Sequence, residues 1–144
     1  MGQNAWPVLS VEEARRRLCE PGSLFEFEVR DINGAPVRVW KNGPQTLPDL
    51  VRAAAGHGDR EFLVLGDERV SFRAFCNAAV VLAQTLRARG VVKGDRVAIA
   101  MRNLPEFPVA FFAAAAVGAI IVPLNAWWTA DELAYALDDS GALS

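Results

Sequence analysis

The sequence is poor in the side chains that most often bind metals or act as nucleophiles. It holds one histidine, His57, and two cysteines, Cys19 and Cys76, that lie far apart. No pair of these residues has the short spacing of a zinc-binding motif, so we expect no metal site. His57 lies in a polar loop, where an exposed side chain is expected rather than half of a catalytic pair. Reduced thiols and the lack of a secretory pattern favour a cytoplasmic protein.

Charge of one sign is also missing. Lysine and arginine number 15 and aspartate and glutamate 17, which leaves a formal net charge of −2. The only basic run, Arg15–Arg17, follows two glutamates in a short helical pattern, where it would complement the C-terminal end of a helix. A basic face of the kind that binds a phosphate backbone is not found, so the sequence predicts no nucleic-acid partner.

One long segment has no charge at all. No charged residue occurs from Phe107 to Ala130, and residues 107–124 are nearly all apolar. About 18 apolar residues are enough for a membrane span. However, residues 111–116 favour a helix and residues 119–122 a short buried strand, and proline and glycine interrupt the run. We therefore predict no transmembrane span.

What the sequence does contain is typical of a globular protein, with 52% apolar and 22% charged residues. A capping-box pattern at Ser10–Glu13 predicts a helix to about Glu20. Alternating apolar residues from Phe25 to Ile32 and again around Val37–Trp40 flank Asn33-Gly34. Because both turn residues accept a positive φ, this pattern predicts a β-hairpin.

The remaining residues alternate between strand and helix patterns. We expect a helix from Thr46 to near Gly56, a hairpin over 61–70 and a helix from Ser71 to Gly90. A strand over 96–101, a helix starting near Pro105 and a strand over 119–122 should follow. The last expected helix begins with a capping box at Thr129 and ends at 138–141. The order strand, helix, strand, helix from residue 95 predicts right-handed crossovers and a parallel sheet. The predicted fold is α/β, with a mainly parallel sheet, flanking helices and an N-terminal β-hairpin. A further strand is expected after Gly141, so the sequence looks truncated.

Few residues suggest chemistry. Gly56-His57-Gly58 is the only G-x-G, and residue 61 is Glu rather than Gly, so we interpret it as a loop and not a phosphate cradle. Asp138-Asp139 are adjacent, so their carboxylates diverge and suit a solvated helix end better than acid–base catalysis. Trp127-Trp128 follow a buried strand, where open α/β sheets bind ligands. They could pack the loop onto the core, or contact an apolar substrate or a neighbouring subdomain.

Specific segments resemble a known family. Gly90–Phe107, which reads GVVKGDRVAIAMRNLPEF, is similar to the block G-V-x-x-G-D-R-V-A-I…x-N-x-P-E-F/W of adenylate-forming (AMP-binding) enzymes. The segments 118–125 and 129–142 match the same family in order and spacing, and Asp67–Phe75 resembles its entry to a helix, with Ser71-Phe72 in place of Thr-Tyr. The resemblance covers residues 47–142. It implies that residues 1–46 are an N-terminal extension and that 47–144 begin an incomplete AMP-binding domain.

The resemblance implies the N-terminal part of an acyl-CoA ligase. Such an enzyme uses ATP and Mg²⁺ to convert a carboxylic acid, here of the fatty-acid type, to an acyl-adenylate, and then transfers the acyl group to CoA. The family's phosphate loop, magnesium-binding acid, ribose-binding Asp and catalytic Lys match no residue of this sequence. We therefore assign no catalytic, cofactor-binding or metal-binding residue. We expect this segment alone to be inactive and to bind ATP, Mg²⁺ and CoA only weakly.

Two further expectations concern partners. The carboxylic acid substrate would be bound by residues outside this segment, and an exposed sheet edge would allow self-association. The alternative function is a non-catalytic binding or interaction domain that uses the same half-fold. Acyl chain length, and an aryl rather than a fatty substrate, stay open at this point.

Overall fold

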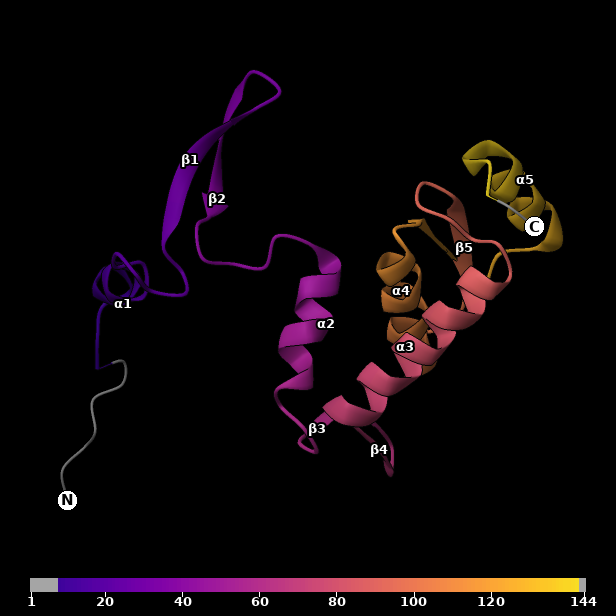
Figure 1. Cartoon of the computed structure of the whole chain (residues 1–144), viewed down its shortest axis with the longest axis horizontal. Helices are drawn as coiled ribbons and strands as arrows, with labels where there is room; N and C mark the ends of the chain where they lie inside the picture. Colours follow the sequence, from indigo (N-terminus) through magenta and orange to yellow (C-terminus); the bar gives the residue numbers. More distant parts are fainter. Residues whose placement is uncertain (1–7, 143–144) are drawn as a thin grey trace. The chain divides into compact units, whose positions relative to one another are not determined.

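The computed structural model describes residues 8–142, and the chain divides into two compact units, Met1–Gln45 and Thr46–Ser144. The first unit holds helix α1 (Val11–Leu18) and strands β1 (Phe27–Ile32) and β2 (Ala35–Trp40) (Figure 1). The second unit holds the remaining elements: α2 (Leu47–Ala55), β3 (Glu61–Leu65), β4 (Glu68–Ser71), α3 (Phe72–Ala88), β5 (Arg96–Ala100), α4 (Glu106–Val117), β6 (Ile120–Leu124) and α5 (Ala130–Ser140).

The N-terminal hairpin confirms the prediction made from its turn. β1 and β2 pair antiparallel, with Ile32 opposite Ala35 next to the turn. Asn33 and Gly34 adopt φ of 55° and 83°, the left-handed values that a two-residue hairpin turn requires.

The helix before this hairpin differs in one detail from the predicted capping box. Ser10 Oγ accepts the N–H of Glu13 at 3.1 Å, which is half of the motif. The Glu13 carboxylate binds Arg16 and Arg17 instead of the N-cap backbone.

The expectation of a mainly parallel sheet is wrong. Residues 8–142 form three two-stranded sheets, β1-β2, β3-β4 and β5-β6, and only the last is parallel. The physical reason is the length of the connections. β3 and β4 are joined by a tight turn at Gly66-Asp67, so they pair with each other antiparallel. A parallel pair needs a crossover, which α4 supplies between β5 and β6.

The core of the second unit lies between α3 and α4. Phe75 is 2% exposed, and its ring meets the edge of Phe112 with centroids 5.8 Å apart. The other facing residues are small: Ala79 and Ala83 on α3, Ala113 and Ala114 on α4. Small side chains allow the two helices to approach closely, and their exposed fractions of 0–8% show that the contact excludes water.

The charge-free segment forms two different elements, as its pattern predicted. α4 ends at Val117 and is capped by Gly118, which has a φ of 81°, and β6 begins at Ile120. No helix within residues 8–142 combines the length and the apolar character that crossing a bilayer requires.

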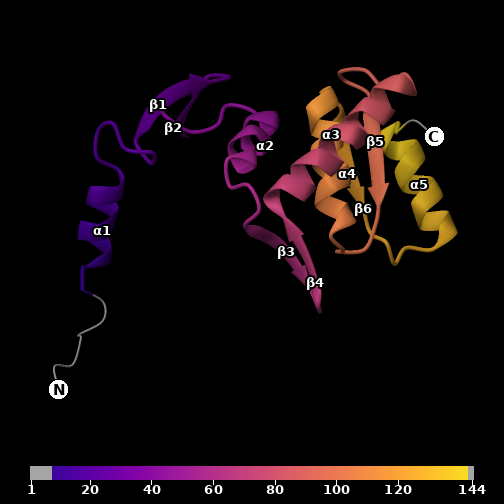
Figure 2. The same ribbon diagram turned by 60° about the horizontal axis from the view of Figure 1, so that its bottom comes forward.

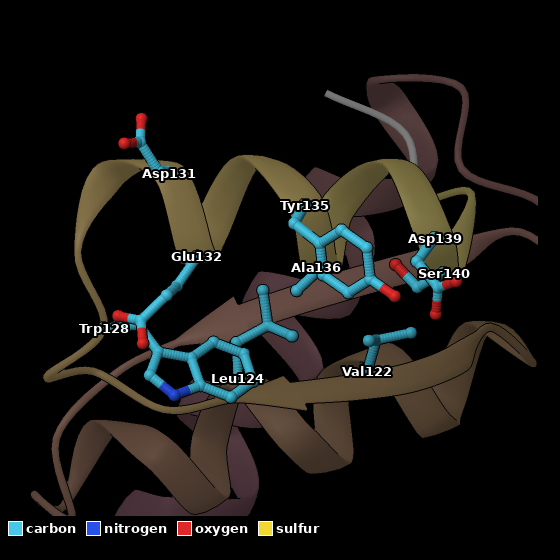
Figure 3. A pocket seen from close by; sticks show the side chains of 9 residues that line it. All are labelled: Val122, Leu124, Trp128, Asp131, Glu132, Tyr135, Ala136, Asp139 and Ser140. Atoms are coloured by element: carbon cyan, nitrogen blue, oxygen red, sulfur yellow. The ribbon is translucent and has the colours of Figure 1, made fainter.

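The parallel pair β5-β6 organises the C-terminal half. Arg96 lies opposite Ile120 and Ala100 opposite Leu124, so both strands end at the same edge. Figures 2 and 3 show α5 on one side of these strands and α3 and α4 on the other.

Candidate functional site

A tight turn after β6 positions the two tryptophans. Asn125 Oδ1 accepts the backbone N–H of Trp127 at 3.0 Å, and the carbonyl oxygen of Asn125 accepts the N–H of Trp128 at 3.2 Å. This turn separates the two side chains. Trp127 is 77% exposed and Trp128 is 38% exposed, so neither indole is fully packed in the core.

Trp128 lies at one end of an open hollow between β6 and α5. The hollow has a volume of about 610 Å³ (Figure 3). Its lining is Val122 and Leu124 of β6, Trp128, and Asp131, Glu132, Tyr135, Ala136, Asp139 and Ser140 of α5. The floor is therefore apolar, and three carboxylates lie along the helix that borders it.

One of these carboxylates is part of the capping box that starts α5. The Glu132 side chain accepts the backbone N–H of Thr129 at 2.7 Å and the Thr129 hydroxyl at 2.9 Å, while Thr129 Oγ1 accepts the N–H of Glu132. The two bonds to the charged form lower the pKa of Glu132, the backbone bond most. The capping box predicted at this position is confirmed.

The adjacent aspartates at the end of α5 do not form an acid–base pair. Asp139 lines the hollow, and Asp138 contributes only its backbone carbonyl oxygen, which accepts the N–H of Gly141 at 3.0 Å. Both side chains are exposed, which agrees with the solvated helix end predicted from the sequence.

Arg102 is a neighbour of Trp127 that the sequence interpretation missed. Its guanidinium carbon lies 5.2 Å from the centroid of the Trp127 ring, within the range of a cation–π contact. The available signal was position: Arg102 follows β5 as Trp127 follows β6, and parallel strands end at a common edge. The contact itself depends on the turn at Asn125 and could not be predicted from spacing.

His57 and Cys76 form no catalytic arrangement. His57 is exposed, its ring centroid lies 4.7 Å from that of Phe72, and Arg60 lies 3.4 Å from its Nδ1. The Cys76 thiol is buried and lies 3.6 Å from the carbonyl oxygen of Val51. Burial raises the pKa of the Cys76 thiol, which keeps it protonated and unreactive.

The structure provides no ligand set for a divalent metal in the part of the chain it describes. Within residues 8–142 no group of three or more His, Cys, Asp or Glu side chains could hold a metal ion. The residues that the structure describes thus do not fit a magnesium site.

Comparison with known proteins gives consistent matches. The model of the AMP-binding enzyme family matches residues 50–143. The chain is 36% identical over 109 residues to a long-chain-fatty-acid–CoA ligase of Salmonella typhimurium, covering 74% of this chain and 19% of that protein. It is 41% identical over 76 residues to the long-chain-fatty-acid–CoA ligase FadD13 of Mycobacterium tuberculosis, covering 53% of this chain and 15% of the relative.

A solved structure shares the fold. The N-terminal subdomain of NpsA from Klebsiella oxytoca, in complex with 3-hydroxyanthranilyl-AMSN, matches 69% of this chain and 26% of that subdomain with a TM-score of 0.65 and 26% identity. The chain spans about a fifth or less of the length of the two curated relatives. Since the family model covers well over half of the residues, and the β5-α4-β6 unit lies inside that match, the chain belongs to the AMP-binding enzyme family.

Proposed function

We propose that the chain is the N-terminal part of an acyl-CoA ligase that activates a carboxylic acid with ATP. The observation that carries the proposal is the identity of 36% over 109 residues to a long-chain-fatty-acid–CoA ligase. In such a reaction ATP converts the acid to an acyl-adenylate and the thiol of CoA then displaces AMP. Two steps are needed because a carboxylate is a poor electrophile until its oxygen becomes part of a good leaving group.

A long-chain fatty acid is the substrate we propose. Both curated relatives described above carry that specificity in their names. The Klebsiella subdomain was solved with an aryl ligand, so an aryl acid is the alternative substrate that an assay should include. Cytoplasmic location belongs to the same proposal, and the two free cysteines support it.

The contribution of residues 90–107 is architectural. Gly94, at a φ of 95°, donates its N–H to the carbonyl oxygen of Gly118 at 3.0 Å. Asp95 Oδ2 accepts the N–H of Val92 at 2.8 Å, and its backbone carbonyl oxygen accepts the N–H of Ile120 at 2.7 Å. The Gly-Asp pair therefore ties the start of β5 to the start of β6. We propose that residues 47–144 begin the AMP-binding domain, that residues 1–46 form an extension before it, and that this scaffold does not catalyse alone.

Acid-dependent exchange between ATP and pyrophosphate tests the proposal. We expect no exchange from the 144-residue chain with fatty or aryl acids, because within residues 8–142 no group of His, Cys, Asp or Glu side chains could hold the metal ion that offsets the phosphate charge. Sequencing the coding region past Ser144 gives the complementary result. An in-frame Ser/Thr/Gly-rich phosphate loop is expected there, while a stop codon directly after Ser144 would contradict the ligase assignment.

The hollow beside Trp128 favours one alternative, a non-catalytic binding domain. The floor of the hollow is apolar and open. Among the carboxylates that line it, Glu132 is used to cap α5. A stop codon after Ser144 together with saturable binding of a small apolar ligand would favour this second function.

A further inference from the structure

Two exposed side chains meet at the ligand-binding edge of the parallel pair. β5 ends at Ala100 and β6 at Leu124, and the two strands run side by side in register. Arg102 and Trp127 each follow one of these ends by two or three residues. In open α/β sheets ligands bind outside the carboxyl ends of the strands. The pair thus lies where the architecture offers a binding surface.

Trp127 presents an unusually open aromatic surface. At 77% exposure it leaves most of its indole in water, although an indole normally stabilises a protein by burial. Asn125 fixes its backbone through the 3.0 Å hydrogen bond to the Trp127 N–H. Because the hydrogen bond already fixes the backbone at Trp127, a ligand that stacks on the ring does not have to order this loop when it binds.

Arg102 adds a positive charge to this surface. Among residues 8–142 its guanidinium forms no ion pair with a carboxylate. It lies 5.2 Å from the centre of the Trp127 ring and leaves its N–H groups available. Glu106, in the first turn of α4, forms no ion pair with Arg102, and the Glu132 carboxylate is bound by Thr129.

We propose that Arg102 and Trp127 form a binding site for an adenosine phosphate. A purine offers the flat π surface that stacks on an indole, and a phosphate group suits the planar, five-donor guanidinium. The choice of adenosine rests on the proposed function, since ATP and CoA both carry an adenosine phosphate. The neighbouring Trp128 lines the apolar hollow instead and provides a matched control.

Nuclear magnetic resonance of the indole Nε1–H groups tests the site on the 144-residue chain. The Trp127 resonance is assigned through Trp127→Phe and followed during titration with adenosine 3′,5′-bisphosphate, ATP, AMP, adenosine and inorganic phosphate. We expect saturable shifts of Trp127 with the adenosine phosphates and weaker effects from adenosine or phosphate alone. Tighter binding of the 3′,5′-bisphosphate would identify the CoA nucleotide as the source, and tighter binding of ATP the triphosphate.

Variants separate stacking from charge. Trp127→Ala should raise the dissociation constant about 5- to 160-fold, the range for one base stacked on an aromatic ring. Arg102→Gln should weaken the binding of the phosphate-bearing ligands but leave the binding of adenosine unchanged. Trp128→Phe should change neither affinity. Since Arg102 and Trp127 are exposed, these variants should retain the fold, which the remaining resonances report.

The proposal is overturned if Trp127 does not respond to any adenosine phosphate, or if Trp128→Phe weakens binding as much as Trp127→Ala. It is equally overturned if Arg102→Gln leaves phosphate binding unchanged. These outcomes are independent of ligase activity, because binding is measured on the chain itself. A stop codon directly after Ser144 with intact binding would therefore reject only the proposed function.

Discussion

At the scale of single residues, two carboxylates in this chain stabilise the starts of helices. Asp49 and Glu132 complete capping boxes with Thr46 and Thr129. Each carboxylate accepts the backbone N–H and the hydroxyl of its threonine. These bonds favour the charged form and lower both pKa values.

Removing one threonine should change the titration of its partner only. We expect Thr129→Val to raise the pKa of Glu132 toward the ordinary value of about 4.3. Because the folded-state pKa of Glu132 lies below the unfolded value, its stabilisation is present above the unfolded pKa and is lost as pH falls through the folded pKa. Carboxyl resonances followed against pH provide the measurement. Thr46→Val is the matched control, which should shift Asp49 and leave Glu132 alone; a Glu132 pKa unaffected by Thr129→Val would contradict the assignment.

At the scale of elements, the passage from α4 to β6 depends on one glycine. Gly118 caps α4 at a φ of 81°, and a Cβ added there would lie 3.0 Å from Lys93 Cγ and 3.2 Å from Lys93 Cβ. Gly141 caps α5 at a φ of 61° with nothing within 4 Å of an added Cβ. The two caps share a backbone conformation and differ in crowding.

This difference predicts unequal costs for the same substitution. Gly141→Ala should lose about 1–2 kcal/mol of unfolding free energy, because a residue with a Cβ is strained at positive φ. Gly118→Ala should lose more, since the near end of the Lys93 side chain cannot move without its backbone. Urea denaturation of the two variants measures both losses. Equal losses would show that the Lys93 contact contributes nothing.

At the scale of the whole molecule, the β5-β6 sheet has only one ladder. Within residues 8–142 neither strand has a second partner, so each has an unpaired edge. Ile120, the first residue of β6, is 50% exposed. Unpaired edges with apolar side chains favour association with another strand.

We predict that the 144-residue chain self-associates through this sheet. Ile120→Lys should shift the chain toward monomer, because a charged residue at an edge opposes strand addition. Sedimentation at increasing protein concentration measures the effect. Val80→Lys, at a helix position that is also 50% exposed, should leave association unchanged. A wild-type chain that stays monomeric at high concentration would reject the prediction.

Local patterns in the sequence were enough to predict most elements and the family. Asn33-Gly34 predicted the first hairpin, and Ser71 and Thr129 predicted helix starts, because each signal depends on neighbouring backbone atoms. The block at Gly90–Phe107 indicated the family for the same reason: its residues shape one turn, one strand and one helix start in sequence order.

How the strand pairs combine into sheets, and the directions of neighbouring side chains, were decided only by the tertiary structure. The predicted hairpins and the predicted parallel pair all form, but within residues 8–142 they make three separate two-stranded sheets instead of one mainly parallel sheet. Trp127 and Trp128 are equivalent in the sequence, yet the turn held by Asn125 leaves one at 77% exposure and the other over an apolar hollow at 38%. Arg102 reaches Trp127 because parallel strands end at one edge. The local backbone thus follows from the sequence, while contacts between distant residues depend on how the strands and helices pack together.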